Sequence, residues 1–292
     1  MIKKLLNSQI QSNISLKKFS SFKIGGLARY FINVHEESFL KKVLEWCVYN
    51  KCRYIVIGNG SNIVFDERGF QGLVIHNCIR SIDIQDEFCI VSAGVRLDVF
   101  IKELAKRGLA GMEFAVGIPG TVGGAVFMNA GAGAFSIGDI IEEVYYMDKN
   151  SRQHVLKSDK LKFSYRYSSF QDIEGSIILG AKLRLSDSKE DLLKKQSEIL
   201  SLRLKKQPYN SPSIGSVFRN PDNNLSAGEL IDGCGLKGTI RGGAQISEKH
   251  ANFIVNIGGA TSEDVLELVK YIKDTVYLKR GVLLKEEYCY VV

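Results

Sequence analysis

Apolar residues recur at three- and four-residue spacing in several stretches of the chain, and this spacing predicts amphipathic helices. The longest of them starts with a capping-box pattern formed by Thr261 and Asp264, and Gly108 ends an earlier one. The predicted helices cover residues 36–50, 97–107, 189–206, 225–231 and a long segment that begins at 261.

Short apolar runs lie between these helices and are predicted to be strands. They cover residues 30–34, 54–57, 64–65, 73–75, 79–84, 88–93, 144–147, 177–185, 253–257 and 282–292. Strands and helices follow no regular βαβ order, which favours an α+β fold over a doubly wound parallel sheet. Residues 1–20 are expected to form a polar lead-in, and residues 211–221 a loop, because turn formers dominate the latter segment.

The run from Gly117 to Gly133 contains six glycines and almost no charge. Glycine has no side chain to pack and loses the most backbone entropy, so the run is expected to form a tight loop rather than a helix or strand. The peptide N–H groups of such a loop can converge on a phosphate. A closely packed turn explains the composition equally well, so the run alone leaves both interpretations open.

A second candidate loop, Gly58-Asn59-Gly60-Ser61-Asn62, directly follows the predicted strand at 54–57. It is not the dinucleotide-binding fingerprint, because Ile63 stands where the third glycine is needed, and no Gly-Lys-Ser/Thr follows either loop. An ordinary turn would explain it alone. Two such loops, each beside an apolar strand, favour one ligand with an extended diphosphate.

Composition and charge exclude several classes of protein. The 292 residues suffice for two or three domains, and 45% hydrophobic with 24% charged residues is typical of globular proteins. The net charge of +7 is spread along the chain, unlike the basic block of a nucleic-acid-binding arm. The six cysteines form no zinc-type cluster, so no metal site is expected. Without a signal-peptide pattern or a run of about 18 apolar residues, we expect a cytoplasmic protein without membrane contact.

Three polar residues could carry chemistry. Arg166 lies among aromatic residues, and its two parallel donors suit a carboxylate, although stacked surface arginines are common. Ser216 lies in a turn-rich segment without a G-x-S-x-G elbow or a histidine triad, which favours a proton donor over a nucleophile. Glu287 lies in the predicted C-terminal strand. Taken singly, each is more readily explained as a structural residue.

Five motifs occur in a fixed order, and together they are far more specific than any one of them. They are the 58–62 loop, Gly117-Ile-Pro-Gly-Thr-Val-Gly-Gly-Ala125 with Asn129, Tyr165-Arg166-x-Ser168-x-Phe170, Gly215-Ser216-x-Phe218-x-Asn220-Pro221 and Lys249-His250-Ala-Asn-Phe253. From about Phe22 to Glu287 the chain closely resembles the UDP-N-acetylenolpyruvoylglucosamine reductase family, flavoenzymes of bacterial cell-wall synthesis.

The resemblance implies a fold and a division into domains. The fold is α+β, with a vanillyl-alcohol-oxidase-type FAD-binding fold in two lobes plus a C-terminal α+β substrate-binding domain. Residues 1–75 and 76–188 would form the two FAD-binding lobes. Residues 189–280 would bind the UDP-sugar, and residues 281–292 would form a strand that returns to the flavin site.

The resemblance also implies the chemistry. NADPH would reduce non-covalently bound FAD, and hydride would then pass from flavin N5 to the β-carbon of the enolpyruvyl ether of UDP-N-acetylglucosamine. Negative charge develops beside the substrate carboxylate in that step, so a cation and a proton donor must be positioned there. Arg166 would hold the carboxylate, Ser216 would protonate the α-carbon, and Glu287 would assist at the same end of the substrate.

The remaining implied site residues contact ligands without reacting. Residues that would line the FAD diphosphate are Gly58, Asn59, Gly60, Ser61, Asn62, Gly117, Ile118, Gly120, Thr121, Gly123, Gly124, Ala125 and Asn129. Residues that would contact the UDP-sugar are Tyr165, Lys206, Tyr209 and Asn220. The expected partners are these small molecules, with no nucleic acid and no membrane, and the chain is expected to be a monomer.

Two departures from the family pattern matter. The tail ends in Tyr290-Val291-Val292 instead of continuing into an Ile-Gly pair, and the assignment of Glu287 rather than Glu286 depends on counting from Gly281. The short segment between residues 166 and 177 lacks the insertion that carries a tyrosine lid, which indicates the lidless subclass.

Three alternatives to a reductase are possible. A sugar or alcohol oxidase of the same fold often attaches its flavin through His or Cys at the first loop, and residues 58–62 contain neither. A non-catalytic flavin- or nucleotide-sugar-binding module would have no use for Arg166, Ser216 and Glu287 together. A P-loop phosphotransferase is disfavoured because the Gly-Lys-Ser/Thr signature is missing.

Overall fold

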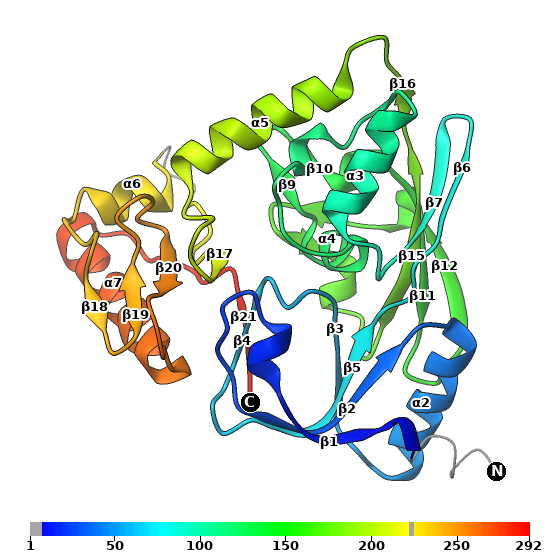
Figure 1. Ribbon diagram of the computed structural model, residues 1–292, viewed down its shortest axis with the longest axis horizontal. Helices are drawn as coiled ribbons and strands as arrows, with labels where there is room; N and C mark the ends of the chain where they lie inside the picture. Colours follow the sequence, from blue (N-terminus) through cyan, green and yellow to red (C-terminus); the bar gives the residue numbers. More distant parts are fainter. Residues whose placement is uncertain (1–7, 222–224) are drawn as a thin grey trace. The chain divides into compact units, whose positions relative to one another are not determined.

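The computed structural model describes residues 8–221 and 225–292, and the chain forms two compact units (Figure 1). The first unit comprises 30–59, 72–201 and the segment that ends at Gln11. The second comprises 12–29, 60–71 and 202–292. The boundary between Asn59 and Gly60 divides the first glycine loop between the two units.

A five-stranded antiparallel sheet with the order β12-β11-β15-β7-β6 forms the centre of the first unit (Figure 1). Helices α3 (Leu97–Lys106) and α4 (Val122–Met128) contribute apolar side chains to the same core as the sheet. Strand β7 alternates buried and less buried residues, whereas the first five residues of β15 are all buried. Ile178 and Ala181 of β15 belong to the core with α3 and α4, and Ile177 and Leu179 belong to a second core, so this strand is covered on both faces. The strands are β6 Ile82–Gln85, β7 Phe88–Ser92, β11 Ile141–Met147, β12 Gln153–Lys157 and β15 Ile177–Arg184.

A second sheet has the strand order β1-β2-β5-β3, in which β3 pairs in parallel with β5. Helix α2 (Glu37–Tyr49) buries Leu40, Val43, Leu44 and Cys47 in a core that also contains Leu73 of β5. The strands are β1 Gln11–Ser15, β2 Leu27–Val34, β3 Tyr54–Ile57 and β5 Phe70–Asn77. The sheet matters for function because β3 ends directly at Gly58.

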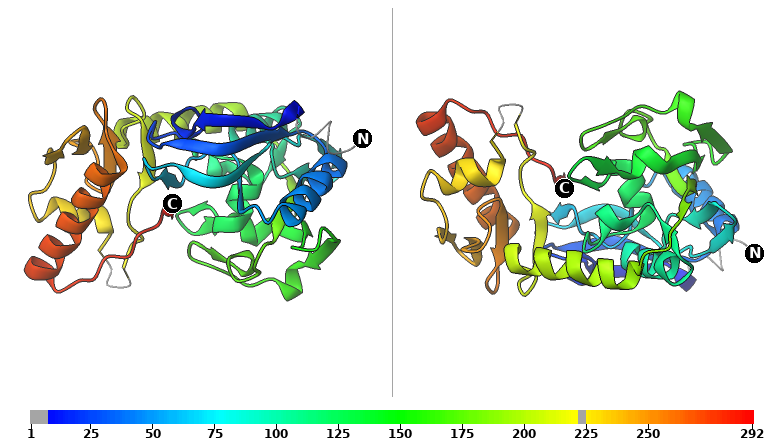
Figure 2. Two further views of the ribbon diagram at one scale, coloured as in Figure 1. Left: turned by 90° about the horizontal axis from the view of Figure 1, so that it is seen from below. Right: turned by 90° about the horizontal axis from the view of Figure 1, so that it is seen from above.

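The second unit is built on a four-stranded sheet with the order β17-β20-β19-β18. Helix α7 (Ser262–Arg280) packs on this sheet and shares its core with α6 (Ala227–Asp232) (Figure 2). Strand β4 (Ile63–Phe65) pairs in parallel with the C-terminal strand β21 (Cys289–Val291). The sheet strands are β17 Ser213–Ser216, β18 Ile240–Arg241, β19 Ala244–Ile246 and β20 Phe253–Asn256.

Helix α5 covers Leu192–Lys206, and the remaining strands are two-residue pairs. These are β8 Leu109–Ala110 with β16 Ser186–Asp187, β9 Gly131–Ala132 with β10 Phe135–Ser136, and β13 Phe163–Ser164 with β14 Tyr167–Ser168. The predicted helices are confirmed as α2, α3, α5, α6 and α7. The capping box at the start of α7 is also confirmed, because Thr261 Oγ1 accepts from the Asp264 N–H at 3.0 Å and Asp264 Oδ2 accepts from the Thr261 N–H at 2.9 Å.

We expected the whole glycine stretch to be a loop, but helix α4 occupies its middle. Thr121 caps the helix by accepting a hydrogen bond from the Gly124 N–H at 3.4 Å, and Asn129 ends it in the left-handed conformation with φ 44°. Burial of Val122 and Val126 in the core offsets the poor helix propensity of the glycines.

Four other predictions need correction. The turn-rich segment 211–221 contains strand β17, which pairs with β20 across a register shift. In the 79–84 run the strand starts only at Ile82, and in the tail only residues 289–291 form a strand. The polar lead-in contains β1 and a 3-10 helix at Leu16–Phe19, whose Leu16 is fully buried. In each case contacts with distant parts of the chain, rather than local composition, determine the secondary structure.

Three further findings concern the described part of the chain. No helix there is long and apolar enough to cross a membrane. The six cysteines are free thiols, and residues 8–221 and 225–292 contain no group of three or more His, Cys, Asp or Glu side chains that could hold a metal ion.

Candidate functional site

The first unit brings the start of one predicted phosphate loop against the other. A Cβ added at Gly58 would lie 2.4 Å from Thr121 Oγ1, so only glycine permits this approach. The Asn59 side-chain amide donates to the Gly120 carbonyl at 3.4 Å. Gly58 therefore lies against Thr121, and Asn59 against Gly120, although the residues of these pairs are 63 and 61 positions apart in the sequence.

Several peptide N–H groups of the second loop are already used within the protein. The Val122 and Gly123 N–H groups donate to the carbonyls of Val95 and Ala93, both at 2.9 Å, and the Gly124 N–H donates to the Thr121 cap. Within the described part of the chain, the N–H groups of Gly120 and Thr121 have no acceptor. The loop can offer these two N–H groups to an anion.

The other predicted cofactor residues of this loop act through close packing. A Cβ at Gly123 would lie 2.7 Å from the Ala93 Cβ, and Ala125 is buried in the core behind the loop. Gly117 and Gly120 adopt φ values of 79° and 147°, which other residues rarely reach. Ile118 packs against the same core.

Asn129 is 5% exposed, and its side chain links two segments of the first unit. Its Nδ2 donates to the Ser164 carbonyl at 2.9 Å, and its Oδ1 accepts from the Gly138 N–H at 3.0 Å. The end of α4 is therefore tied to the hairpin that carries Arg166. The Asn129 side chain already has these two partners within the protein, and its contact with a cofactor stays a prediction.

Arg166 lies at the tip of the β13–β14 hairpin, in the two-residue turn with Tyr165. Its φ of 56° is unusual for a residue with a side chain and occurs most often where surrounding structure enforces it. Its Nη1 donates to the Gly131 carbonyl at 3.1 Å, and its guanidinium carbon lies 5.1 Å from the centre of the Tyr165 ring. The Gln171 amide holds the Arg166 carbonyl at 3.1 Å. The second half of the glycine stretch and Arg166 thus come together in the first unit.

The second unit brings Asn62, Ser216 and Glu287 onto neighbouring backbone segments. The Glu287 N–H donates to the carbonyl of Val217, the residue after Ser216, at 2.8 Å. The Asn62 side-chain amide donates to the Glu287 carbonyl at 3.1 Å, and the Asn62 carbonyl accepts from the Cys289 N–H at 2.9 Å. Both backbone polar groups of Glu287 are therefore fixed.

The tail beyond Glu287 is held by a buried carboxylate. Tyr290 donates through its hydroxyl to Asp66 at 2.5 Å, and Arg68 binds both carboxylate oxygens of Asp66 at 2.9 and 2.7 Å. These hydrogen bonds, with that of Arg68 the stronger, hold the pKa of Asp66 well below its usual range. Burial, with the nearby Glu286 carboxylate, raises the pKa of Tyr288 to about 12.

The other predicted residues of the second unit lie on separate elements. Gly60 has φ 58°, and a Cβ there would lie 1.9 Å from the Phe19 carbonyl oxygen; Ser61 is the next residue of the same loop and is half-buried. Lys206 is the exposed last residue of α5, and Tyr209 is 38% exposed three residues later. Asn220 Oδ1 accepts from the Ala227 N–H at the start of α6 at 3.0 Å. Their contact with a UDP-sugar stays a prediction.

Comparison with known proteins decides the family. A family model for the FAD binding domain matches residues 28–157, and one for the UDP-N-acetylenolpyruvoylglucosamine reductase C-terminal domain matches residues 207–291. The UDP-N-acetylenolpyruvoylglucosamine reductase of Protochlamydia amoebophila is 44% identical over 97% of this chain and 94% of its own length. That of Chlamydia abortus is 43% identical over 95% of this chain and 93% of its own. The chain belongs to the UDP-N-acetylenolpyruvoylglucosamine reductase family.

The solved structure of a family member agrees with the fold. The crystal structure of the Thermus caldophilus enzyme matches with a TM-score of 0.82 and 35% identity, covering 96% of this chain and 98% of that one. The expected α+β fold with an FAD-binding domain is confirmed, as is the expected class of enzyme, an FAD-dependent oxidoreductase with NADPH as reductant.

The geometry of the glycine loops fits the diphosphate of FAD. The approach of Gly58 to Thr121 and of Gly123 to Ala93 leaves no room for a side chain at either glycine, so close packing between segments requires glycine at both positions. The Gly120 and Thr121 N–H groups are donors without intramolecular acceptors in the described part of the chain, and residues 58–62 and 117–125 contain no carboxylate to repel an anion. The absence of His and Cys from 58–62 agrees with a flavin that is not covalently attached.

Reasoning from the sequence missed two reductase residues that organise the second unit. Asn252 holds both backbone polar groups of Phe218, and Lys249 Nζ donates to the Leu204 carbonyl at 2.6 Å near the end of α5. Both belong to the Lys249–Phe253 motif, which supported the family resemblance but was given no role. Their place in that motif was the signal that could have found them.

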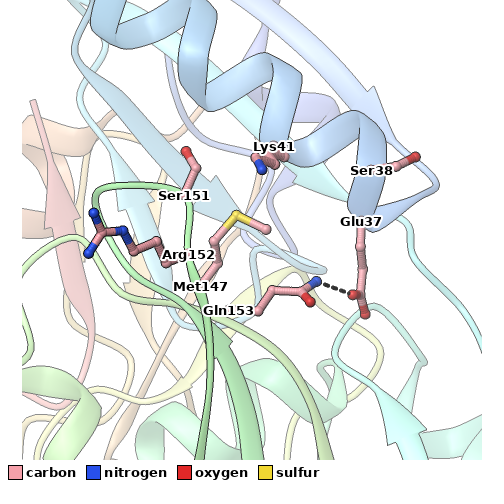
Figure 3. A pocket seen from close by; sticks show the side chains of 7 residues that line it. All are labelled: Glu37, Ser38, Lys41, Met147, Ser151, Arg152 and Gln153. Atoms are coloured by element: carbon pink, nitrogen blue, oxygen red, sulfur yellow. Dashed lines mark hydrogen bonds between the residues drawn. The ribbon is translucent and has the colours of Figure 1, made fainter.

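One open pocket of about 430 Å³ in the first unit contains none of the predicted site residues (Figure 3). The Gln153 amide donates to Glu37 at its rim at 2.7 Å. It is lined by Glu37, Ser38, Lys41, Met147, Ser151, Arg152 and Gln153.

Proposed function

We propose that this reductase forms UDP-N-acetylmuramate by reducing the enolpyruvyl ether of UDP-N-acetylglucosamine with hydride from NADPH, and that Ser216 gives the final proton to the α-carbon. Family membership supports the overall reaction. The observation that carries the assignment of residues is the 2.8 Å hydrogen bond from the Glu287 N–H to the Val217 carbonyl. This bond joins the segments of Ser216 and Glu287, and its two residues, Val217 and Glu287, are 70 positions apart in the sequence.

Bound FAD would supply the hydride chemistry, and the protein supplies position and electrostatics. The Gly120 and Thr121 N–H groups would hold the diphosphate. Arg166 would bind the substrate carboxylate, where negative charge grows during reduction of the alkene. Its turn is held by the Gln171 amide and its guanidinium by the Gly131 carbonyl, so little conformational freedom remains to be lost on binding.

Ser216 would donate its hydroxyl proton to the α-carbon, and Glu287 would assist at the same end of the substrate. A serine hydroxyl is a weak acid at neutral pH, so this step requires a site that stabilises the alkoxide as the proton leaves. Support comes from the pairing of the two segments: Phe218 and Glu286 form an antiparallel bridge, and the Arg219 N–H donates to the Lys285 carbonyl at 2.9 Å. A rigid pairing of this kind suits a proton donor that must meet one carbon atom.

Ser216→Ala tests the assignment in anaerobic stopped-flow experiments that follow the flavin absorbance. We expect NADPH to reduce the variant's flavin at the normal rate and the enolpyruvyl substrate to reoxidise it about 10²–10⁴-fold more slowly. Ser213→Ala is the matched control, because Ser213 lies three residues earlier on the same strand β17. Normal reoxidation by Ser216→Ala, or a loss of the first half-reaction, would refute the role of Ser216. A flavin that recovers only with oxygen would indicate an oxidase.

The same proposal includes the domain assignment, the contacts with the UDP-sugar and the oligomeric state. The lobes at 1–75 and 76–188 would bind FAD, residues 189–280 the UDP-sugar through Lys206, Tyr209 and Asn220, and residues 281–292 would return to the flavin. Tyr165 would contact the substrate from the Arg166 turn. The enzyme would act as a cytoplasmic monomer on small molecules. Sedimentation at micromolar concentration tests the oligomeric state, and a dimer would refute the expectation.

A further inference from the structure

Asn252, at the end of the Lys249–Phe253 motif, holds the backbone next to Ser216. It is 4% exposed. Its Oδ1 accepts from the Phe218 N–H at 3.0 Å, and its Nδ2 donates to the Phe218 carbonyl at 2.8 Å. Its own carbonyl accepts from the Val217 N–H at 2.9 Å. One buried asparagine therefore satisfies three polar groups of residues 217 and 218.

This contact matters because the strand ladder does not fix Ser216 by itself. Strand β17 pairs with β20 at Ser213 opposite Val255 and at Ser216 opposite Phe253, with a register shift between them. Gly215 lies in this irregular stretch with φ 83°. An irregular ladder leaves the direction of the following backbone to other contacts. Asn252 supplies those contacts directly after Ser216.

The same backbone segment also positions Glu287. The Val217 carbonyl accepts from the Glu287 N–H, and Phe218 forms the bridge with Glu286. A displacement of residues 217 and 218 would therefore move the segments of Ser216 and Glu287 together. Asn62 holds Glu287 from its carbonyl side, so the effect of losing Asn252 would be greatest at Ser216 and at the N–H side of Glu287.

We propose that Asn252 is a positioning residue for the second half-reaction, acting through the backbone of residues 217 and 218 on Ser216 and Glu287. The inference rests on the proposed function of those two residues. Both ends of its carboxamide are occupied by Phe218, and the residue is buried, so it acts without touching a ligand. A small displacement at a reacting centre is sufficient to slow the chemistry strongly.

Asn252→Asp tests the proposal with almost no change in volume. The carboxylate keeps an acceptor for the Phe218 N–H but loses the donor to the Phe218 carbonyl and places one oxygen against another. We expect reoxidation of the flavin by the enolpyruvyl substrate to slow by about tenfold to hundredfold, while reduction by NADPH stays within about twofold. Asn252→Ser removes the contact without adding charge and serves if the aspartate variant does not fold.

Asn256→Asp is the matched control. Asn256 lies four residues later, at the end of β20, and its Nδ2 donates to the Phe22 carbonyl at 3.1 Å while its Oδ1 accepts from the Gly258 N–H at 2.9 Å. This variant loses an equivalent backbone contact away from Ser216. We expect normal half-reactions from Asn256→Asp, and a change in unfolding midpoint similar to that of Asn252→Asp.

Hydrogen exchange gives a readout that does not depend on activity. In Asn252→Asp, peptides covering 213–219 and 284–289 should exchange faster than in the wild-type protein, and in Asn256→Asp they should not. Unchanged exchange there, unchanged reoxidation, or equal slowing of both half-reactions would overturn the role of Asn252. Parallel Ser216→Ala and Glu287→Gln variants separate the two proposals. If they reoxidise normally, the proposed function fails; if they are slow and Asn252→Asp is not, only the positioning role fails.

Discussion

Gly58→Ala is the substitution for which the structure predicts the sharpest consequence. The new Cβ would lie 2.4 Å from Thr121 Oγ1, 2.9 Å from its Cγ2 and 3.2 Å from its Cβ. Thr121 is 5% exposed and caps α4, so it cannot turn away without breaking its hydrogen bond to the Gly124 N–H. Overpacking costs about 1–3 kcal/mol and a lost cap about 1 kcal/mol, so we expect a loss of roughly 2–4 kcal/mol in the free energy of unfolding.

The contact with Thr121 can be isolated by a double-mutant cycle. Thr121→Ala alone should cost about 1 kcal/mol, the value of a helix cap. In that background the two close atoms are gone and only the 3.2 Å Cβ contact remains, so adding Gly58→Ala should cost less than about 1 kcal/mol. The double variant should therefore be more stable than Gly58→Ala alone, which reverses the usual additivity of destabilising changes.

The assay is urea unfolding followed by circular dichroism, with FAD affinity measured in parallel by flavin fluorescence. Gly58→Ala should also weaken FAD binding, because the displaced Thr121 carries one of the two N–H donors of the loop. Gly133→Ala is the control in the same glycine stretch, since a Cβ there would meet nothing within 4 Å although φ is 65°. An equal cost of Gly58→Ala in both backgrounds would refute the explanation by steric contact with Thr121.

Two further predictions concern titratable groups. Because Arg68 and Tyr290 lower the pKa of Asp66, its ionised form stabilises the fold above the ordinary carboxyl pKa of about 4, and this contribution is lost as the pH falls towards the lowered value. Urea midpoints should therefore fall more steeply between about pH 4 and pH 2 for the wild-type protein than for Asp66→Asn, and parallel curves would contradict the role of Asp66. Burial raises the pKa of Cys47 and of Cys89 to about 12, so a disulfide reagent at pH 8 should label neither thiol until urea unfolds the protein; rapid labelling of either, located by peptide mapping, would show that its burial is wrong.

Periodicity predicted the helices well, because their apolar faces are repeated in the sequence itself. The face of α2 that buries Leu40, Val43, Leu44 and Cys47 is one example, and the Thr261–Asp264 cap is a local signal of the same kind. Strand β17 was missed because its partner β20 lies about 40 residues later and its own composition favours turns. Helix α4 was missed because its stability comes from burial and from the Thr121 cap rather than from propensity.

The candidate site was predicted residue by residue, but not the contacts that hold it. The sequence places Gly58 and Thr121 in two loops. Only the folded structure shows that the missing side chain of Gly58 makes room for the side chain of Thr121. Arg166 became a candidate because it lies among aromatic residues and within a motif of the family, whereas its left-handed conformation and its bond to the Gly131 carbonyl depend on a hairpin that no local pattern indicated. Long-range backbone pairing, such as that of Val217 with Glu287, has no signature in one sequence.

A common principle connects the two units. In the first unit, the N–H groups that the loop can offer to an anion are those without an acceptor in the protein. The Val122 and Gly123 N–H groups donate to carbonyls of the chain after β7, whereas those of Gly120 and Thr121 have no acceptor in the described part of the chain. In the second, the place of Ser216 follows from an irregular strand whose missing contacts are supplied by Asn252. Substitutions that leave every predicted ligand contact intact should therefore still impair the reductase, provided that they change which backbone groups are satisfied near the loops. Glycine and asparagine are the residues to test first, because one permits close backbone approach and the other replaces a backbone partner.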